Sequence, residues 1–375
     1  MKDLFRMVDL KNQYLDIKSE IDEKIQETID STQFIGGENV EVFKTSLQKY
    51  LGVNYVIPCA NGTDALQISL MSLNLNRGDE IIVPAFTYIS TAEVIGLLGL
   101  KPIIVDVDYF NFNISIEKLE GLITNKTKVI IPVHLFGQSS PMEDILLLSD
   151  KYNLFVIEDN AQSLGADFIF KDGKRQKLGT IGHIGCTSFF PSKNLGCFGD
   201  GGAIMTNNKE LAVKLKTISN HGQSKKYHHD IIGCNSRLDS IQAAVLNVKL
   251  KYLDLYNQKR NKSAIFYNNQ LKKIKEISIP NEVNYSTHVY HQYTLKIKQG
   301  KRDMLKLYLN EKNIQTMIYY PIPLHKQRAF KFGNNFSLPI SEKLCKEVIS
   351  LPMHTELDNS SQEYIIKSIK SFFKL

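Results

Sequence analysis

The sequence predicts an α/β fold, with a mainly parallel sheet covered by helices on both faces and a smaller α+β domain after it. In the first two-thirds of the 375 residues, short apolar runs alternate with stretches of helical periodicity. This alternation is typical of parallel strands joined by helices. After the expected strand at 203–206 the pattern changes to one long helical stretch at 239–271, followed by short strands and helices. We therefore expect a large domain over residues 1–249 and a small domain over residues 250–375.

The individual elements follow from the period of the apolar residues. Leu66, Ile68, Leu70 and Leu73, for example, have helical spacing. Strands are expected at 54–59, 80–84, 102–106, 128–133, 154–158, 203–206 and 291–297. Helices are expected at 63–75, 91–98, 142–152, 239–271, 303–310 and 362–373. Several strands end in polar or small residues, and such residues gather at one edge of a parallel sheet.

Composition excludes several classes of protein. The net charge is +7, but the lysines are scattered and form no basic helix or aromatic-interleaved stripe, so no nucleic-acid partner is expected. No apolar run is long enough to span a membrane, and residues 1–6 lack the apolar core of a signal peptide. We therefore expect a cytoplasmic protein. The five cysteines form no CxxC pair, so we expect reduced thiols, no disulfide framework and no metal site.

Lys193 lies in the loop motif SFFPSKNLG (188–196), which GDGG (199–202) follows. A loop lysine is most often a solvated surface side chain. Here the glycines allow a ligand to approach the backbone closely, and a lysine desolvated between aromatic rings loses proton affinity. A neutral lysine amine is what a Schiff base with pyridoxal 5′-phosphate (PLP) requires.

Asp159 and Gln162 lie in the motif VIEDNAQSLG (156–165), at the end of an apolar strand. An acid at this position can cap a helix, bind a metal or pair with a buried cation. It can also hold the pyridine nitrogen of PLP protonated, which makes the ring an electron sink. Asp159 fits that last role, and Gln162 is placed to donate to the ring hydroxyl oxygen.

Two further motifs complete this set. In ANGTDAL (60–66) a strand ends and a helix begins, so the backbone around Gly62 and Thr63 is suited to bind a phosphate. Simple capping of the helix by Asn61 or Thr63 explains the same residues. Ser188 could add a hydroxyl to the phosphate site. Tyr88, in PAFTYIST (84–91), is interpreted equally well as core packing and as a ring stacked on the cofactor.

In these motifs, and in YPIPLH (320–325), the chain resembles the DegT/StrS family of fold-type I PLP-dependent sugar aminotransferases. The resemblance runs from VDL (8–10) to SLPM (350–353). It implies a seven-stranded-type sheet. It also implies Lys193 as the Schiff-base lysine, Asp159 as partner of the ring nitrogen and Gln162 as the ring-hydroxyl contact. The resemblance further assigns phosphate contacts and a stacking ring, which are Gly62, Thr63, Ser188 and Tyr88.

The resemblance also implies a homodimer with composite active sites. Asn235 and Arg237 lie in GCNSRLD (233–239), a segment that the partner subunit contributes in this family. Asn235 is then expected at the cofactor phosphate. Arg237 is the candidate cation for a substrate carboxylate, or else forms an interface salt bridge. Tyr320, His325 and His221 are the further candidate substrate contacts, although a loop or interface role is as well founded for His221.

Because this chain has a lysine, Lys193, at the position of the Schiff-base residue, we expect transamination, with L-glutamate as amino donor and 2-oxoglutarate as product. Within the family, the motifs are most similar to enzymes that aminate C3 of UDP-2-acetamido-2-deoxy-3-oxo-glucuronate for bacterial O-antigen. Other candidate substrates are a dTDP-linked 3-keto-6-deoxyhexose, UDP-3-keto-N-acetylglucosamine and a 4-keto nucleotide sugar. Two alternatives lie outside this activity: a PLP-binding regulator without turnover, and a nucleotide-binding α/β protein without PLP.

Overall fold

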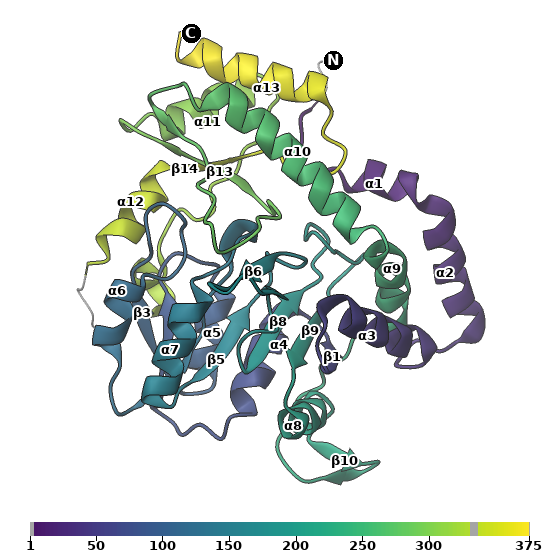
Figure 1. Cartoon of the computed structure of the whole chain (residues 1–375). Coiled ribbons are helices and arrows are strands. Elements are labelled where there is room, and N and C mark those ends of the chain that lie inside the picture. Colours follow the sequence, from purple (N-terminus) through teal and green to yellow (C-terminus); the bar gives the residue numbers. More distant parts are fainter. Residues whose placement is uncertain (1–3, 331–336, 375) are drawn as a thin grey trace.

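A seven-stranded sheet forms the centre of the computed structural model, which describes residues 4–330 and 337–374 (Figure 1). The first three residues of the chain start considered above lie outside the described residues. The strand order is β1-β9-β8-β5-β4-β2-β3. The strands are β1 (Tyr55–Cys59), β2 (Glu80–Pro84), β3 (Lys101–Val105), β4 (Thr127–Ile130), β5 (Phe155–Asp159), β8 (Ile184–Ser188) and β9 (Gly202–Thr206). β9 runs antiparallel to β1 and β8, and the other pairs are parallel. The predicted mainly parallel sheet is confirmed.

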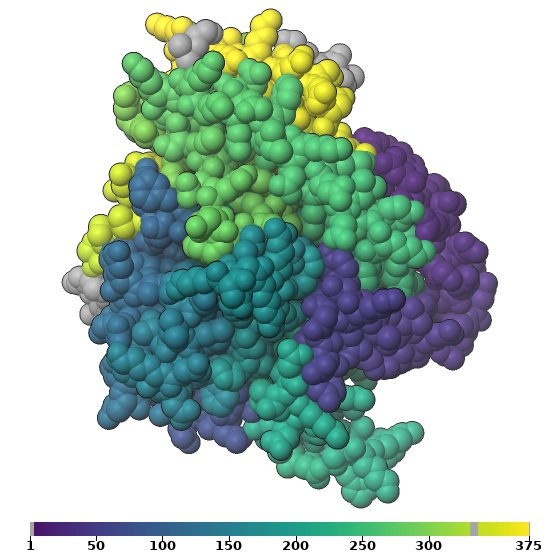
Figure 2. Space-filling model, viewed as in Figure 1, coloured from purple at the N-terminus to yellow at the C-terminus, as the bar shows by residue number. Residues whose placement is uncertain are grey.

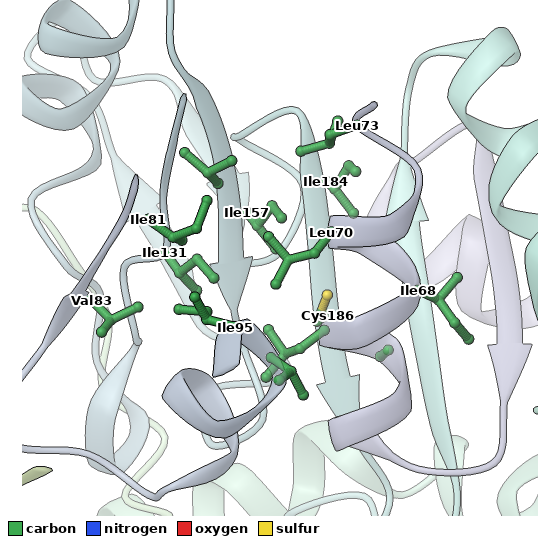
Figure 3. Close-up of a cluster of buried hydrophobic side chains, with 14 of the residues drawn as sticks. Ile68, Leu70, Leu73, Ile81, Val83, Ile95, Ile131, Ile157, Ile184 and Cys186 are labelled. Carbon is green, nitrogen blue, oxygen red and sulfur yellow. The ribbon is translucent and has the colours of Figure 1, made fainter. Parts of the chain in front are cut away.

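Helices cover both faces of this sheet. The helices of this part of the chain are α1 (Leu10–Asp16), α2 (Lys18–Ser31), α3 (Glu38–Leu51), α4 (Gly62–Met71), α5 (Ser90–Leu97), α6 (Ile116–Leu119), α7 (Met142–Tyr152), α8 (Lys209–Ser219) and α9 (Ser240–Leu250), with short 3₁₀ turns at η1 (Glu120–Leu122) and η2 (Leu135–Gly137). Of these, α2 packs on α9 and not on the sheet. Ile81 of β2 packs with Leu70 of α4 on one face, where Figure 3 shows them in one cluster. The next strand residue, Ile82, packs with Ile145 of α7 on the other face. Successive strand residues point to opposite faces, so an uninterrupted apolar strand fills two cores.

The C-terminal part has its own sheet and core. Its elements are α10 (Leu253–Leu271), β12 (Ile277–Ser278), β13 (Tyr293–Ile297), α11 (Arg302–Glu311), η3 (Leu324–Lys326), η4 (Arg328–Phe330), α12 (Pro339–Glu347), β14 (Val348–Leu351) and α13 (Asn359–Phe372). β13 lies between β12 and β14 in an antiparallel sheet, and Tyr267, Leu295 and Ile365 share its core. The helix expected at 239–271 is wrong in one respect, because it is interrupted between Leu250 and Leu253.

The start of the described chain packs on the C-terminal part. Phe5 stacks on Tyr364 of α13 with ring centroids 4.9 Å apart, and its amide donates to Asn313 O. The α9–α10 break lies near the predicted domain boundary at residues 249 and 250. That boundary stays a prediction.

Two small hairpins complete the fold: β6 (Asp167–Ile169) with β7 (Arg175–Lys177), and β10 (Gln223–Lys225) with β11 (His228–His229). The second hairpin stands away from the body beyond α8 (Figures 1 and 2). Tyr227 is 79% exposed there and Ile232 is 88% exposed.

Within residues 4–330 and 337–374, no helix is long and apolar enough to cross a membrane. In the same ranges, no group of three or more His, Cys, Asp or Glu side chains is arranged to hold a metal ion. All five cysteines are free, and four of them are buried.

Candidate active site

Asp159 ends β5 at the carboxyl edge of the sheet and is buried. Its two carboxylate oxygens have separate donors. The hydroxyl of Thr91 donates to Oδ2 at 2.8 Å, and the amide of Ala161 donates to Oδ1 at 3.2 Å. Both donors fix the orientation of the carboxylate.

The neighbouring acid, Glu158, points to the opposite side of the strand and has a structural role. Its Oε2 lies 2.8 Å from His134 Nε2, and its Oε1 accepts from the amides of Ile181 and Gly182 at 2.6 Å each. The amide of Ser140 donates to His134 Nδ1, so Nε2 carries the imidazole proton. These bonds hold the loop before β8 against the end of β5, which leaves Asp159 as the acid available to a ligand.

Lys193 lies in the loop after β8, near enough to Asp159 for the two charges to interact. The lysine is half-buried. Desolvation lowers the pKa of its ammonium to about 8, while the negative charge of Asp159 acts in the opposite direction. A substantial fraction of the Lys193 amine is therefore neutral near physiological pH.

Lowered pKa alone does not single out Lys193. Burial also lowers the pKa of Lys249 and of Lys296 to about 8. Those two side chains are almost wholly buried, and the ammonium of Lys296 donates to the carbonyl of Tyr109 at 2.9 Å. Lys193 combines the lowered pKa with access to solvent and a carboxylate at the edge of the sheet.

The loop of Lys193 is fixed by its neighbour Asn194. The Asn194 side-chain amide donates to Asn257 Oδ1 at 2.7 Å and to Val289 O at 3.0 Å. Its oxygen lies 3.2 Å from Nδ1 of His291, a buried residue whose pKa desolvation holds well below the usual range. A neutral histidine thus lies beside the lysine, and the loop is tied to α10 and to the segment before β13.

The start of α4 forms a close-fitting cradle with the end of β8. A Cβ atom added at Gly62 would lie 2.8 Å from Ser188 Cβ, so only glycine fits there without a shift. Asn61 Oδ1 accepts from the amide of Asp64, which confirms the capping alternative for Asn61. The first-turn amides of Gly62 and Thr63 have no partner within the helix and are suited to bind an anion.

A further side of the site is formed by Gln162, Tyr320 and Tyr88. The Gln162 side chain donates to Tyr320 Oη at 3.1 Å and accepts from the amide of Phe136 at 2.8 Å. Burial raises the pKa of Tyr320, so its hydroxyl stays protonated. The Tyr88 ring lies 6.2 Å from the Tyr320 ring and is 56% exposed. The exposure excludes the core-packing alternative for Tyr88.

Four other predicted residues are placed by different contacts. His325 is buried, with Nε2 3.0 Å from Glu342 Oε1 of α12, which gives it a structural contact. His221 is exposed, and its carbonyl lies 2.9 Å from His229 Nδ1 beside the projecting hairpin. Asn235 and Arg237 are exposed and alternate with the buried Ser236 and Leu238, so they face away from their own subunit.

Sequence reasoning missed Thr91, Asn194 and His291. Asn194 follows the lysine directly, and this proximity is a signal that could have found it. His291 was assigned only to a strand, and Thr91 only to a helix. Their contacts with the site come from residues far apart in the chain, which a single sequence does not reveal.

Comparison with known proteins decides the family. The sequence model of the DegT/DnrJ/EryC1/StrS aminotransferases matches residues 15–370. The chain belongs to this family. The DegT/DnrJ/EryC1/StrS aminotransferases are PLP-dependent, so the expected fold type, cofactor and class of enzyme are confirmed: the protein is a PLP-dependent sugar aminotransferase.

Three relatives illustrate the range of the family. The chain is 43% identical to the UDP-2-acetamido-2-deoxy-3-oxo-D-glucuronate aminotransferase of Pseudomonas aeruginosa, covering 98% of this chain and 99% of that one. It is also 43% identical to a pleiotropic regulatory protein of Geobacillus stearothermophilus, covering 98% of each. The crystal structure of S. venezuelae DesV in complex with a ketimine intermediate covers 100% of both chains, with a TM-score of 0.95 and 33% identity.

The residues observed here fit PLP. Glycine at 62 leaves room at the α4 amides, where a phosphate group is stabilised by the helix start. Asp159 is an acid with two ordered donors, suited to face a protonated ring nitrogen. Lys193 is an accessible lysine with a pKa of about 8, as a reacting amine requires.

Proposed function

We propose that this aminotransferase moves an amino group from L-glutamate to C3 of a nucleotide-linked 3-keto sugar, releasing 2-oxoglutarate. The proposed substrate is UDP-2-acetamido-2-deoxy-3-oxo-glucuronate. The observation that carries the chemistry is the pairing of Lys193, whose pKa is about 8, with Asp159 at the edge of the sheet. The substrate is supported by near full-length similarity to the Pseudomonas enzyme.

In the proposed mechanism Lys193 is the covalent attachment point and the general acid–base. When bound, PLP supplies an electron sink that stabilises negative charge on the carbon next to the amine nitrogen. The Lys193 amine, whose pKa is about 8, takes the proton from the donor carbon. It then donates this proton to the carbon on the other side of the amine nitrogen. The same lysine performs the reverse transfer when the keto sugar is aminated.

The remaining residues position the reactants. We assign Gly62, Thr63 and Ser188 to the phosphate, and Tyr88 to the face of the ring. Asp159 holds the proton at the ring nitrogen, and Gln162, itself held by Tyr320 and Phe136, faces the ring hydroxyl. Tyr320 borders the same space through its bond to Gln162. It is therefore the better supported of the two YPIPLH candidates for substrate contact, because His325 is held by Glu342.

We also propose that the active site is completed by a second copy of the chain. Asn235 and Arg237 are exposed on their own subunit, as residues that reach into a partner's site must be. Asn235 is assigned to the partner's phosphate site and Arg237 to the uronate carboxylate, which a guanidinium binds with two parallel hydrogen bonds. His221, beside the exposed hairpin, is proposed to line the same side of that site.

Substrate assays test this proposal. Holoenzyme is incubated with glutamate and, separately, with UDP- and dTDP-linked 3-keto sugars and a 4-keto nucleotide sugar, and 2-oxoglutarate formation is measured. We expect the UDP-linked 3-oxo-glucuronate to give the highest kcat/KM. A higher value for another sugar would replace the proposed substrate, and binding of PLP without turnover on any of them would favour a regulator.

Arg237 provides the sharper test of the carboxylate. Arg237→Ala is expected to lower kcat/KM for the uronate far more than for the matching neutral sugar. Arg237→Lys keeps the charge but loses the two parallel hydrogen bonds. Its kcat/KM for the uronate should therefore lie between those of the wild type and Arg237→Ala. An equal loss on both sugars would remove Arg237 from carboxylate recognition and favour the interface salt bridge.

A cytoplasmic location and a role in O-antigen or other surface polysaccharide are proposed with this substrate.

A further inference from the structure

Thr91 is a fully buried threonine in the first turn of α5, and its hydroxyl lies 2.8 Å from Asp159 Oδ2. A threonine in the first turn of a helix has no preceding helical turn whose carbonyl could accept from its hydroxyl. Here the hydroxyl is directed to a carboxylate on another element, 68 residues along the chain. This contact is not needed to cap α5 or to pair a strand.

The surroundings of Thr91 hold the hydroxyl in place. Its neighbours Ala92, Val94 and Ile95 are fully buried, and Ile95 packs in the cluster between α4, α5 and the sheet (Figure 3). A hydrogen bond from a neutral donor to a carboxylate is strengthened in such a dry environment. Because the helix cannot turn without disrupting this core, Asp159 has a fixed donor on Oδ2.

This donor acts on the orientation of the Asp159 carboxylate. With Oδ2 held by the Thr91 hydroxyl and Oδ1 by the amide of Ala161, the plane of the carboxylate is fixed. A carboxylate in a fixed orientation forms a strong hydrogen bond with a protonated ring nitrogen and so stabilises the proton there. Loss of the donor lets the carboxylate turn, which weakens that hydrogen bond and leaves the ring proton less firmly held.

We propose that Thr91 is a positioning residue, which orients Asp159 so that the proton stays on the cofactor ring nitrogen. The inference rests on the proposed role of Asp159. It adds a second function to the segment after β2, because the same segment carries Tyr88, three residues before Thr91. One short segment thus supplies both the ring that covers the cofactor and the hydroxyl that sets its partner acid.

The test reads the ring proton directly. Holoenzyme is prepared with PLP labelled with ¹⁵N in the ring, and the ¹⁵N chemical shift is measured for wild type, Thr91→Val, Thr91→Ser and Asp159→Asn. Thr91→Val replaces the hydroxyl by a methyl group of similar size, and Thr91→Ser keeps the hydroxyl. We expect a pyridinium shift in wild type and Thr91→Ser, and a displacement toward neutral pyridine in Thr91→Val and Asp159→Asn.

Turnover gives a second readout. The rate of the half-reaction with glutamate should fall about 10- to 100-fold in Thr91→Val, as expected for one lost hydrogen bond to a charged group, and much less in Thr91→Ser. If Thr91→Val does not retain PLP, the smaller Thr91→Ala is measured instead, because it lacks the same hydroxyl.

The outcomes separate the two claims. A wild-type ¹⁵N shift in Thr91→Val, together with a displaced shift in Asp159→Asn, would overturn the role of Thr91 and leave that of Asp159 intact. A displacement in Thr91→Ser as large as in Thr91→Val would attribute the effect to packing and also overturn it. A neutral pyridine shift in wild type, or no change in Asp159→Asn, would overturn the proposed role of Asp159 itself.

Discussion

Replacing Gly62 by alanine is expected to weaken PLP binding, because the new methyl group enters the space between α4 and β8. The added Cβ would lie 2.8 Å from Ser188 Cβ, whereas two carbon atoms in van der Waals contact lie about 3.5–4.0 Å apart. The helix start or the end of β8 must move by roughly the difference, about 1 Å. Overpacking of this kind costs about 1–3 kcal/mol, which corresponds to about 5- to 150-fold in Kd if it falls on the bound state.

The assay is a titration of PLP-free protein with PLP, followed by absorbance, for a set of matched variants. Ser188→Ala keeps the clashing Cβ and loses the hydroxyl, whereas Ser188→Gly loses both. The double variant Gly62→Ala/Ser188→Gly should therefore bind PLP more tightly than Gly62→Ala/Ser188→Ala. Wild-type affinity in Gly62→Ala, or equal affinity in the two double variants, would refute the cradle.

Three further predictions test other parts of the site. The lowered pKa of Lys193 predicts that PLP uptake by PLP-free protein accelerates from pH 6 to about 8 and then levels, because the neutral amine is the reacting form above its pKa of about 8. A rate that keeps rising toward pH 10 would contradict it. Asn194→Ala should lower the free energy of unfolding by about 1–3 kcal/mol in urea titrations, since it leaves Val289 O and Asn257 without their donor. Combining it with Asn257→Ala should cost less than the sum of the two single changes, and full additivity would argue against the contact. Tyr88→Ala should raise the Kd for PLP but change stability by less than about 0.5 kcal/mol, because the ring is 56% exposed; a large loss of stability would show that it packs in the core.

The sheet was predictable because its strands are locally apolar. β2 and α7 have the bounds that periodicity predicted, since each is a run whose burial depends on its own side chains. β8, with the sequence IGCTS, was not predicted as a strand, because its small and polar residues form no apolar run. The interruption between α9 and α10 was missed for a related reason. Lys251 is a good helix former and Tyr252 is not a helix breaker, so no local signal marks the interruption.

A sequence motif can indicate a site residue where the reactive side chain and its neighbours are close together in the chain. Asp159 ends β5, Gly62 follows β1 and Lys193 follows β8, and the carboxyl ends of these strands lie at one edge of the sheet. The residues that contact the predicted side chains lie far from them in the sequence. Thr91 meets Asp159, and His325 meets Glu342, only because of helix placement that no local pattern encodes. This is why neither contact could be predicted from the sequence.

The central claim is that Lys193 is the lysine that binds the cofactor. Holoenzyme reduced with borohydride and digested with a protease should carry PLP on the peptide that contains Lys193, as identified by mass spectrometry. Lys249 and Lys296 are internal controls, because burial lowers the pKa of each to about 8 as well. A single labelled site at Lys193 is the predicted result. Label on Lys249, Lys296 or any other lysine in place of Lys193, or a reduced holoenzyme without label, would contradict the account.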